Sequence, residues 1–92
     1  MKEVRAGMFA WSLAGHDKGR LYIVLGADDS FLYLADGMLR TADRPKKKKR
    51  KHVQTEYAAD PLIAEKILRG AQIRDEDLRR AVKGKQKAGG KA

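Results

Sequence analysis

The stretch Trp11–Gly26, WSLAGHDKGRLYIVLG, joins two segments suited to β-strands through a short charged loop. Gly15 and Gly19 bracket that loop, and glycine tolerates the positive φ that a short chain reversal often needs. The residues after the loop, from Arg20 to Leu25, are rich in β-branched and aromatic side chains, and Gly26 closes the run. The stretch therefore predicts a β-hairpin with charged residues at its tip.

Further strands are expected on both sides of this hairpin. Asp36-Gly37 is the strongest two-residue turn signal in the chain and predicts a type I′ turn, with positive φ at both residues. Short strands at about ten-residue spacing are typical of a small barrel or sandwich. The five strands are expected at 7–12, 20–25, 30–35, 38–41 and 52–55.

The sequence changes character at Asp60, which can cap a helix whose first residue is Pro61. Leu62 and Leu68 belong to an apolar face at helical spacing, and Gly70 is a natural helix end. A second short helix is expected from Asp75 to Lys83, ending at Gly84, followed by a disordered lysine-rich tail. The predicted organisation is a β-domain over 1–57, a helical appendage over 58–83 and the tail over 84–92.

Composition excludes several classes of protein. The 92 residues allow one small domain, which we expect to be a monomer, and with no cysteine there is no disulfide framework and no thiolate metal site. Neither histidine has a neighbouring ligand, so no metal or other cofactor is expected. No apolar run approaches the roughly 20 residues that a membrane helix needs, and the N-terminus lacks the apolar segment of a secretory signal. We therefore expect a cytoplasmic protein that does not enter membranes.

The net charge of +9 is concentrated in two places. Residues 44–55 contain seven Lys or Arg and no Asp or Glu, and residues 83–92 contain four lysines and no acid. The remaining parts of the chain are close to neutral. Clustered charge raises the local electrostatic potential, which is typical of proteins that bind polyanions.

Several of these features together resemble a KOW motif, the strand-loop-strand element of several ribosomal proteins and transcription-elongation factors. The match covers roughly residues 7 to 55 and extends to small bacterial KOW-domain RNA-binding proteins, which are similar to large-subunit ribosomal proteins of archaeal and eukaryotic type. The resemblance implies an SH3-like five-stranded β-barrel, RNA binding and no catalysis. The residues that carry it are the Gly15–Gly19 loop, Asp36-Gly37-Met38-Leu39-Arg40, Pro45, and the run Lys46–Lys51 with His52.

The expected partner is structured RNA, on or around the ribosome, bound through its phosphates. The basic run Lys46–Lys51 is expected to hold phosphates, because a folded domain has no structural use for so many adjacent like charges. A solvated flexible loop and a nuclear-import peptide are the alternative interpretations of this run. The expected RNA-binding residues are Lys18, Arg20, Arg40, Arg44, Lys46, Lys47, Lys48, Lys49, Arg50, Lys51 and His52, with Gly15, Asp17 and Gly19 shaping the loop.

The aromatic residues leave two interpretations open. Trp11 and Phe31 are expected mainly in the core, whereas Tyr22 and Tyr33 fit either the core or a surface that stacks on unpaired bases. No nucleophile-base pair or carboxylate pair is apparent, so an enzyme is not expected. The alternative function is a protein-interaction module, in which the barrel or the apolar helix face from Leu62 to Leu68 binds a protein and the basic run tethers the complex near nucleic acid.

Overall fold

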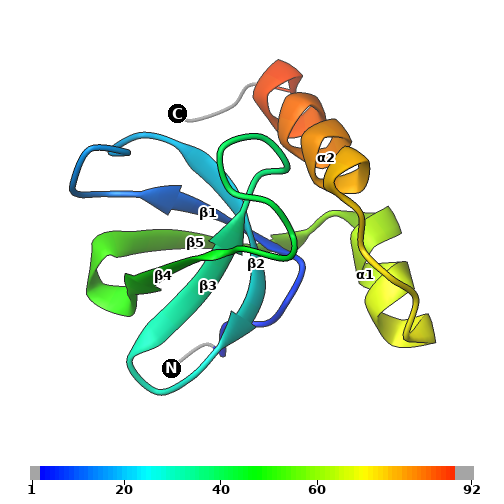
Figure 1. Cartoon of the computed structure of the whole chain (residues 1–92), viewed down its shortest axis with the longest axis horizontal. Helices are drawn as coiled ribbons and strands as arrows, with labels where there is room; N and C mark the ends of the chain where they lie inside the picture. Colours follow the sequence, from blue (N-terminus) through cyan, green and yellow to red (C-terminus); the bar gives the residue numbers. More distant parts are fainter. Residues whose placement is uncertain (1–2, 89–92) are drawn as a thin grey trace.

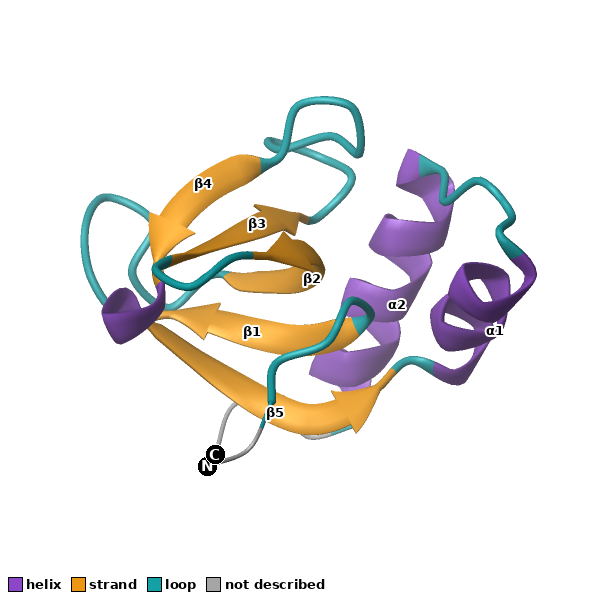
Figure 2. Cartoon of the chain, turned by 90° about the horizontal axis from the view of Figure 1, so that it is seen from below, coloured by secondary structure: helices purple, strands orange, loops and turns teal. Residues whose placement is uncertain are grey.

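The computed structural model describes residues 3–88, which form a five-stranded sheet followed by two helices (Figure 1). A single turn of 3-10 helix separates the last two strands. Both α-helices lie on the same side of the sheet (Figure 2). The elements are β1 Met8–Ser12, β2 Leu21–Ala27, β3 Phe31–Ala35, β4 Lys46–Lys49, η1 Arg50–His52, β5 Val53–Ala59, α1 Pro61–Arg69 and α2 Asp75–Lys87.

The sheet is antiparallel, with the strand order β4-β3-β2-β1-β5. The prediction of a mainly β protein with two C-terminal helices is thus confirmed. The sheet is open, because β4 and β5 form its two edges and are joined only through η1 along the chain, so a closed SH3-like barrel is not confirmed. Register shifts between Met8 and Phe9, and between Val24 and Gly26, interrupt the ladders of β1 and β2.

The first three predicted strands are confirmed within two residues, but the fourth is wrong. Residues 38–41 form a turn, because the buried carboxylate of Asp36 accepts hydrogen bonds from the backbone N–H groups of Met38 and Arg40 at 3.0 Å each. The strand that pairs with β3 is instead the lysine run of β4. The predicted fifth strand exists, and it extends to Ala59.

The predicted type I′ turn is also wrong. Gly37 has φ 79°, but no described residue other than glycine has a positive φ, so Asp36 does not adopt the conformation that this turn needs. Gly15 and Gly19 do adopt positive φ, as expected for the loop between β1 and β2. Gly37 has a second role, because its backbone lies directly against the first turn of α2.

Alternating side chains build two apolar clusters on the two faces of the sheet. Phe9, Trp11 and Ile23 face the helices, where they pack with α1 and α2 residues such as Ile63 and Leu78. The opposite, curled face holds a second cluster made by the strands alone, which comprises Met8, Ala10, Tyr22, Val24, Leu32 and Leu34. The helices therefore complete one of the two cores.

The helix α1 begins and ends as the sequence predicts. The side chain of Asp60 accepts a hydrogen bond from the N–H of Ile63 at 3.0 Å, and Gly70 ends the helix in the left-handed conformation. The predicted end of the second helix at Gly84 is wrong, since α2 continues to Lys87. Lys85 accounts for this extension, because its ammonium pairs with Glu56 and lies over the Phe9 ring. Residues 84–88 of the predicted disordered tail are therefore ordered, and residues 89–92 lie outside the described part of the chain.

Candidate nucleic-acid interface

The strand β4 divides its four lysines between the two faces of the sheet. Lys46 and Lys48 pair with Leu34 and Leu32, so their side chains share the curled inner face. Their side chains are 24% and 10% exposed. The other two lysines, at 47 and 49, are exposed on the outer face. The basic run is thus neither a flexible loop nor a uniform patch of solvated charge.

Asp17, at the tip of the β1–β2 loop, holds the two inward lysines. Lys46 Nζ and Lys48 Nζ each lie 3.1 Å from its carboxylate oxygens. The same carboxylate accepts hydrogen bonds from Ser12 Oγ at 2.8 Å and from the Tyr22 hydroxyl at 2.7 Å. Lys48 Nζ also donates to the backbone oxygen of Ala14 at 2.8 Å. These contacts fasten the edge strand β4 to the β1–β2 loop.

The ionisation of this cluster follows from its contacts. Burial by itself would raise the pKa of Asp17, but hydrogen bonds from Tyr22, Ser12, Lys46 and Lys48 outweigh it and hold the pKa far below its usual range. Burial and the hydrogen bond to the Asp17 carboxylate both raise the pKa of Tyr22. At neutral pH the cluster therefore pairs an ionised carboxylate on Asp17 with a neutral phenol on Tyr22.

Arg20 takes part in a second buried ion pair. Its Nε and Nη2 lie 2.8 and 2.6 Å from Asp36 Oδ2, and the Asp36 side chain is only 1% exposed. Burial would raise the pKa of Asp36, but backbone N–H groups of Arg40 and Met38, together with Arg20, lower it. Asp36 is therefore ionised, and its negative charge is balanced by Arg20. Through this ion pair Arg20 stabilises the fold.

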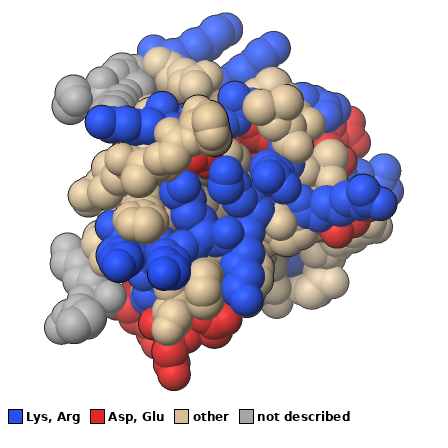
Figure 3. Space-filling model, turned by 60° about the vertical axis from the view of Figure 1, so that its left-hand side comes forward, with Lys and Arg blue, Asp and Glu red and all other residues tan. Residues whose placement is uncertain are grey.

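The outward cations gather at the end of the molecule where β4 meets η1. Lys47 Nζ lies 4.3 Å from the centroid of the Phe31 ring, a cation–π contact that leaves the ammonium on the surface. Lys49, Arg50 and Lys51 border a shallow depression of about 370 Å³, and Arg50 Nε donates to the backbone oxygen of Asp28 at 2.8 Å. Figure 3 shows Lys and Arg side chains clustered over the face on this side of the molecule, with acidic side chains toward its margins.

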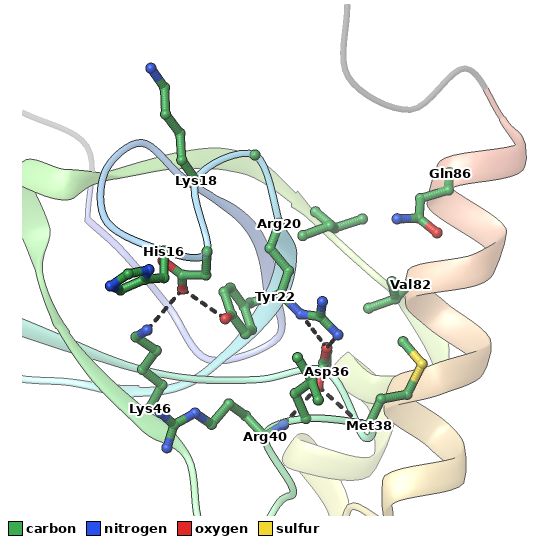
Figure 4. A pocket seen from close by; sticks show the side chains of 14 residues that line it. His16, Lys18, Arg20, Tyr22, Asp36, Met38, Arg40, Lys46, Val82 and Gln86 are labelled. Carbon is green, nitrogen blue, oxygen red and sulfur yellow. Dashed lines mark hydrogen bonds and ion pairs between the residues drawn. The ribbon is translucent and has the colours of Figure 1, made fainter.

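A larger hollow of about 580 Å³ lies at the other end of β4, between the β1–β2 loop, the β3–β4 loop and α2 (Figure 4). Lys18, Arg20, Arg40 and Lys46 all line it, together with His16. Four residues that the sequence predicts to bind RNA therefore meet here, although they come from three different segments. Its floor contains the carboxylates of Asp17 and Asp36, both of which are paired with cations.

The remaining predicted residues lie apart from this hollow. Arg44 is exposed in the loop that leads into β4, and the backbone oxygen of the half-buried His52 accepts a hydrogen bond from the N–H of Leu13. Trp11 is buried, as expected, and so is Tyr22. Phe31 and Tyr33 are half-buried on the outer face of β3, where the Tyr33 hydroxyl donates to Asp28 Oδ2.

Sequence reasoning missed the side of the hollow that α2 forms through Val82 and Gln86, and it also missed two exposed apolar residues of the β3–β4 loop. Met38 and Leu39 line the hollow and are 49% and 73% exposed, whereas the sequence placed them in a strand. The signal that could have located them is the acidic residue before Gly37, since Asp side chains often accept hydrogen bonds from N–H groups just beyond them in a turn. Their exposure at a turn follows directly from that interpretation.

Within residues 3–88, no group of three or more His, Asp or Glu side chains is arranged to hold a metal ion. None of the helices in that part of the chain is long and apolar enough to cross a membrane. Comparison with protein-family models gave no match for the chain. Curated proteins likewise include no significant match to it.

Proposed function

We propose that this chain is a non-catalytic RNA-binding protein that contacts the phosphates of structured RNA. The observation that carries the proposal is the division of the basic run in β4. Asp17 neutralises part of the inward charge, while Lys47, Lys49 and Lys51 remain exposed in β4 and η1. A folded domain gains little from so many exposed ammonium groups in one short segment, whereas a polyanion that binds them releases counterions.

The architecture supports the same proposal. A small antiparallel sheet with the order β4-β3-β2-β1-β5, whose edge strands are linked by one 3-10 turn, is compatible with the SH3-like barrel that the KOW resemblance implies. The ion pair between Asp17 and Lys48 joins the β1–β2 loop to the edge strand β4. We therefore propose a KOW-type RNA-binding module, associated with ribosomal RNA in the cytoplasm.

A variant that separates binding from folding tests this proposal. Lys47→Ala/Lys49→Ala removes two outward charges and should weaken binding to a structured RNA about tenfold or more at low salt, with little change in melting temperature. Replacing all four lysines would mix the two effects, because Lys46 and Lys48 hold Asp17. Affinity is measured by fluorescence anisotropy and folding by circular dichroism.

The matched control is Arg69→Glu, which lowers the net charge by the same two units at the exposed C-terminal end of α1, far from β4 (Figure 1). It should weaken binding far less than the β4 variant does. Equal losses in the two variants would mean that only net charge matters, and they would contradict an interface at β4.

A protein-interaction module is the second candidate function. The observation that favours it is the solvent-facing side of α1, where Leu62 is 55% exposed and Leu68 is 89% exposed. A protein held on this face would depend little on salt, whereas a phosphate interface depends strongly on it. If this second candidate is correct, Leu68→Ser should abolish binding of the protein partner. If the chain is an RNA-binding protein, the same variant should leave its affinity for RNA unchanged.

A further inference from the structure

The hollow next to α2 has the dimensions of a ligand site. Its volume of about 580 Å³ lies within the range of roughly 300–1,000 Å³ that small-molecule sites occupy. Three separate segments form its walls, and Figure 4 shows Val82 and Gln86 of α2 projecting toward the two loops, while Lys18 extends outward from the β1–β2 loop. The hollow is therefore large enough for one nucleotide and too small for a duplex.

The apolar wall of the hollow is held in place before any ligand arrives. Met38 and Leu39 form the tip of the β3–β4 loop, and the Asp36 carboxylate fixes this tip through the N–H of Met38. Arg79 Nη1 in α2 donates to the backbone oxygen of Gly37 at 2.8 Å and fixes the loop from the other side. A rigid loop that exposes two large apolar side chains offers contact area at little cost in conformational entropy.

The polar wall of the hollow is positively charged. The carboxylates of Asp17 and Asp36 are each compensated by cations, so they offer little repulsion to an anion. Lys18 and Arg40 are exposed, and neither has a side-chain partner among residues 3–88. The Arg40 guanidinium and the His16 imidazole are planar groups, of the kind on which RNA-binding proteins stack unpaired bases.

From this combination we infer that the hollow holds a single unpaired nucleotide of the bound RNA. The base contacts Met38 and Leu39 and stacks on Arg40, and its phosphate lies near Lys18. A base inside a duplex cannot reach such a site, so the preferred target has a bulged or looped-out nucleotide next to a paired segment. The inference rests on the proposed RNA binding and specifies the kind of RNA.

Two RNA duplexes that differ by one bulged nucleotide test the inference. Base contacts of this kind favour the bulged duplex, and we expect the protein to bind it about tenfold more tightly than the fully paired one. Met38→Ser/Leu39→Ser should reduce the ratio of the two affinities to about one. Leu68→Ser, which replaces another exposed leucine far from the hollow, should leave the ratio at its original value.

Two outcomes would overturn the inference while RNA binding stands. The first is equal affinity of the unchanged protein for both duplexes. The second is a double variant that still prefers the bulged duplex. Circular dichroism shows whether the double variant is folded, and Leu39→Ser alone, which leaves the Met38 side chain in place, repeats the test if it is not. Absence of salt-dependent binding to both duplexes would instead overturn the proposed function itself, and the inference with it.

Discussion

At the scale of single residues, Asp17 determines which lysines of β4 can face a ligand. Its side chain is 11% exposed and accepts hydrogen bonds or ion pairs from four side chains. A buried carboxylate without partners would be costly, and two buried ammonium groups without a carboxylate would be costlier still. The cluster therefore stabilises the fold only as a complete set.

Asp17→Ala should destabilise the protein by about 2–4 kcal/mol, because the buried Tyr22 hydroxyl would lose its acceptor and the buried Lys48 would lose its carboxylate partner. For a domain of this size, that change lowers the melting temperature by roughly 10 °C or more. Thermal unfolding followed by circular dichroism measures it. Asp29→Ala, at an exposed turn, is the control and should stay within about 0.5 kcal/mol. Similar melting temperatures for both variants would contradict the role of Asp17.

The sequence predicts Asp17 only as a residue that shapes the loop. Ser12 and Tyr22 are each five positions away, but Lys46 and Lys48 are about thirty residues further along the chain. No local pattern connects residues at that distance. Their pairing follows from the placement of β4 next to β3, which the sequence did not predict.

At the scale of elements, the contact between the β3–β4 loop and α2 depends on Gly37. A Cβ added there would lie 2.3 Å from the backbone oxygen of Asp75. Gly19, in the β1–β2 loop, has a similar positive φ but no atom within 4 Å of such a Cβ. The two glycines therefore share the conformational requirement and differ in the space around them.

Gly19→Ala should cost about 1–2 kcal/mol, the price of a left-handed conformation for a residue with a side chain. Gly37→Ala should cost clearly more, since backbone atoms of α2 must also move away. Thermal melting of the two variants gives the difference. Equal melting temperatures would show that α2 does not pack against this loop as described.

The strand β4 shows where sequence patterns fail for an element. Lysine has a low preference for strands, and four adjacent lysines repel one another, so no propensity argument places a strand at 46–49. Tertiary contacts outweigh both effects here, because Asp17 neutralises the inward side chains and Phe31 receives Lys47. By contrast, α1 was predictable from its own residues, since Asp60, Pro61 and Gly70 each act locally.

At the scale of the whole molecule, buried carboxylates make the fold sensitive to acid. The pKa values of Asp17, Asp36 and Asp60 all lie below their usual range: burial opposes the shift at each site, and cationic and hydrogen-bonding partners outweigh it. A carboxyl group whose pKa is lower in the folded state binds fewer protons there than in the unfolded state. Its stabilising contribution is present above the unfolded value of about 3.9 and is lost as the pH falls toward the folded value.

The melting temperature should therefore change little between about pH 7 and 5 and fall steeply below about pH 4. Asp36→Asn should melt lower at pH 7 and show a smaller fall on acidification, because one of the linked groups is gone. Calorimetry or circular dichroism from pH 7 to 2 measures both curves. A melting temperature that stays constant down to pH 2 would contradict the ionised, partnered state of these residues.

The whole-molecule charge distribution was largely predictable, whereas its division between two faces was not. The sequence places seven of the basic residues in one short segment, and the structure brings Lys18 and Arg40 to the same end of the sheet as Lys46. Six of these basic residues are exposed and can contact phosphates: Lys18, Arg40, Arg44, Lys47, Lys49 and Lys51.

The salt dependence of RNA affinity tests the phosphate interface most directly. Plotted as log K against log salt concentration, the affinity for a structured RNA should fall with a slope of roughly −4 to −5, from ~0.7–0.9 per phosphate over about six contacts. Lys47→Ala/Lys49→Ala should reduce the magnitude of that slope by about 2. A flat dependence, or the same slope in the variant, would contradict the account.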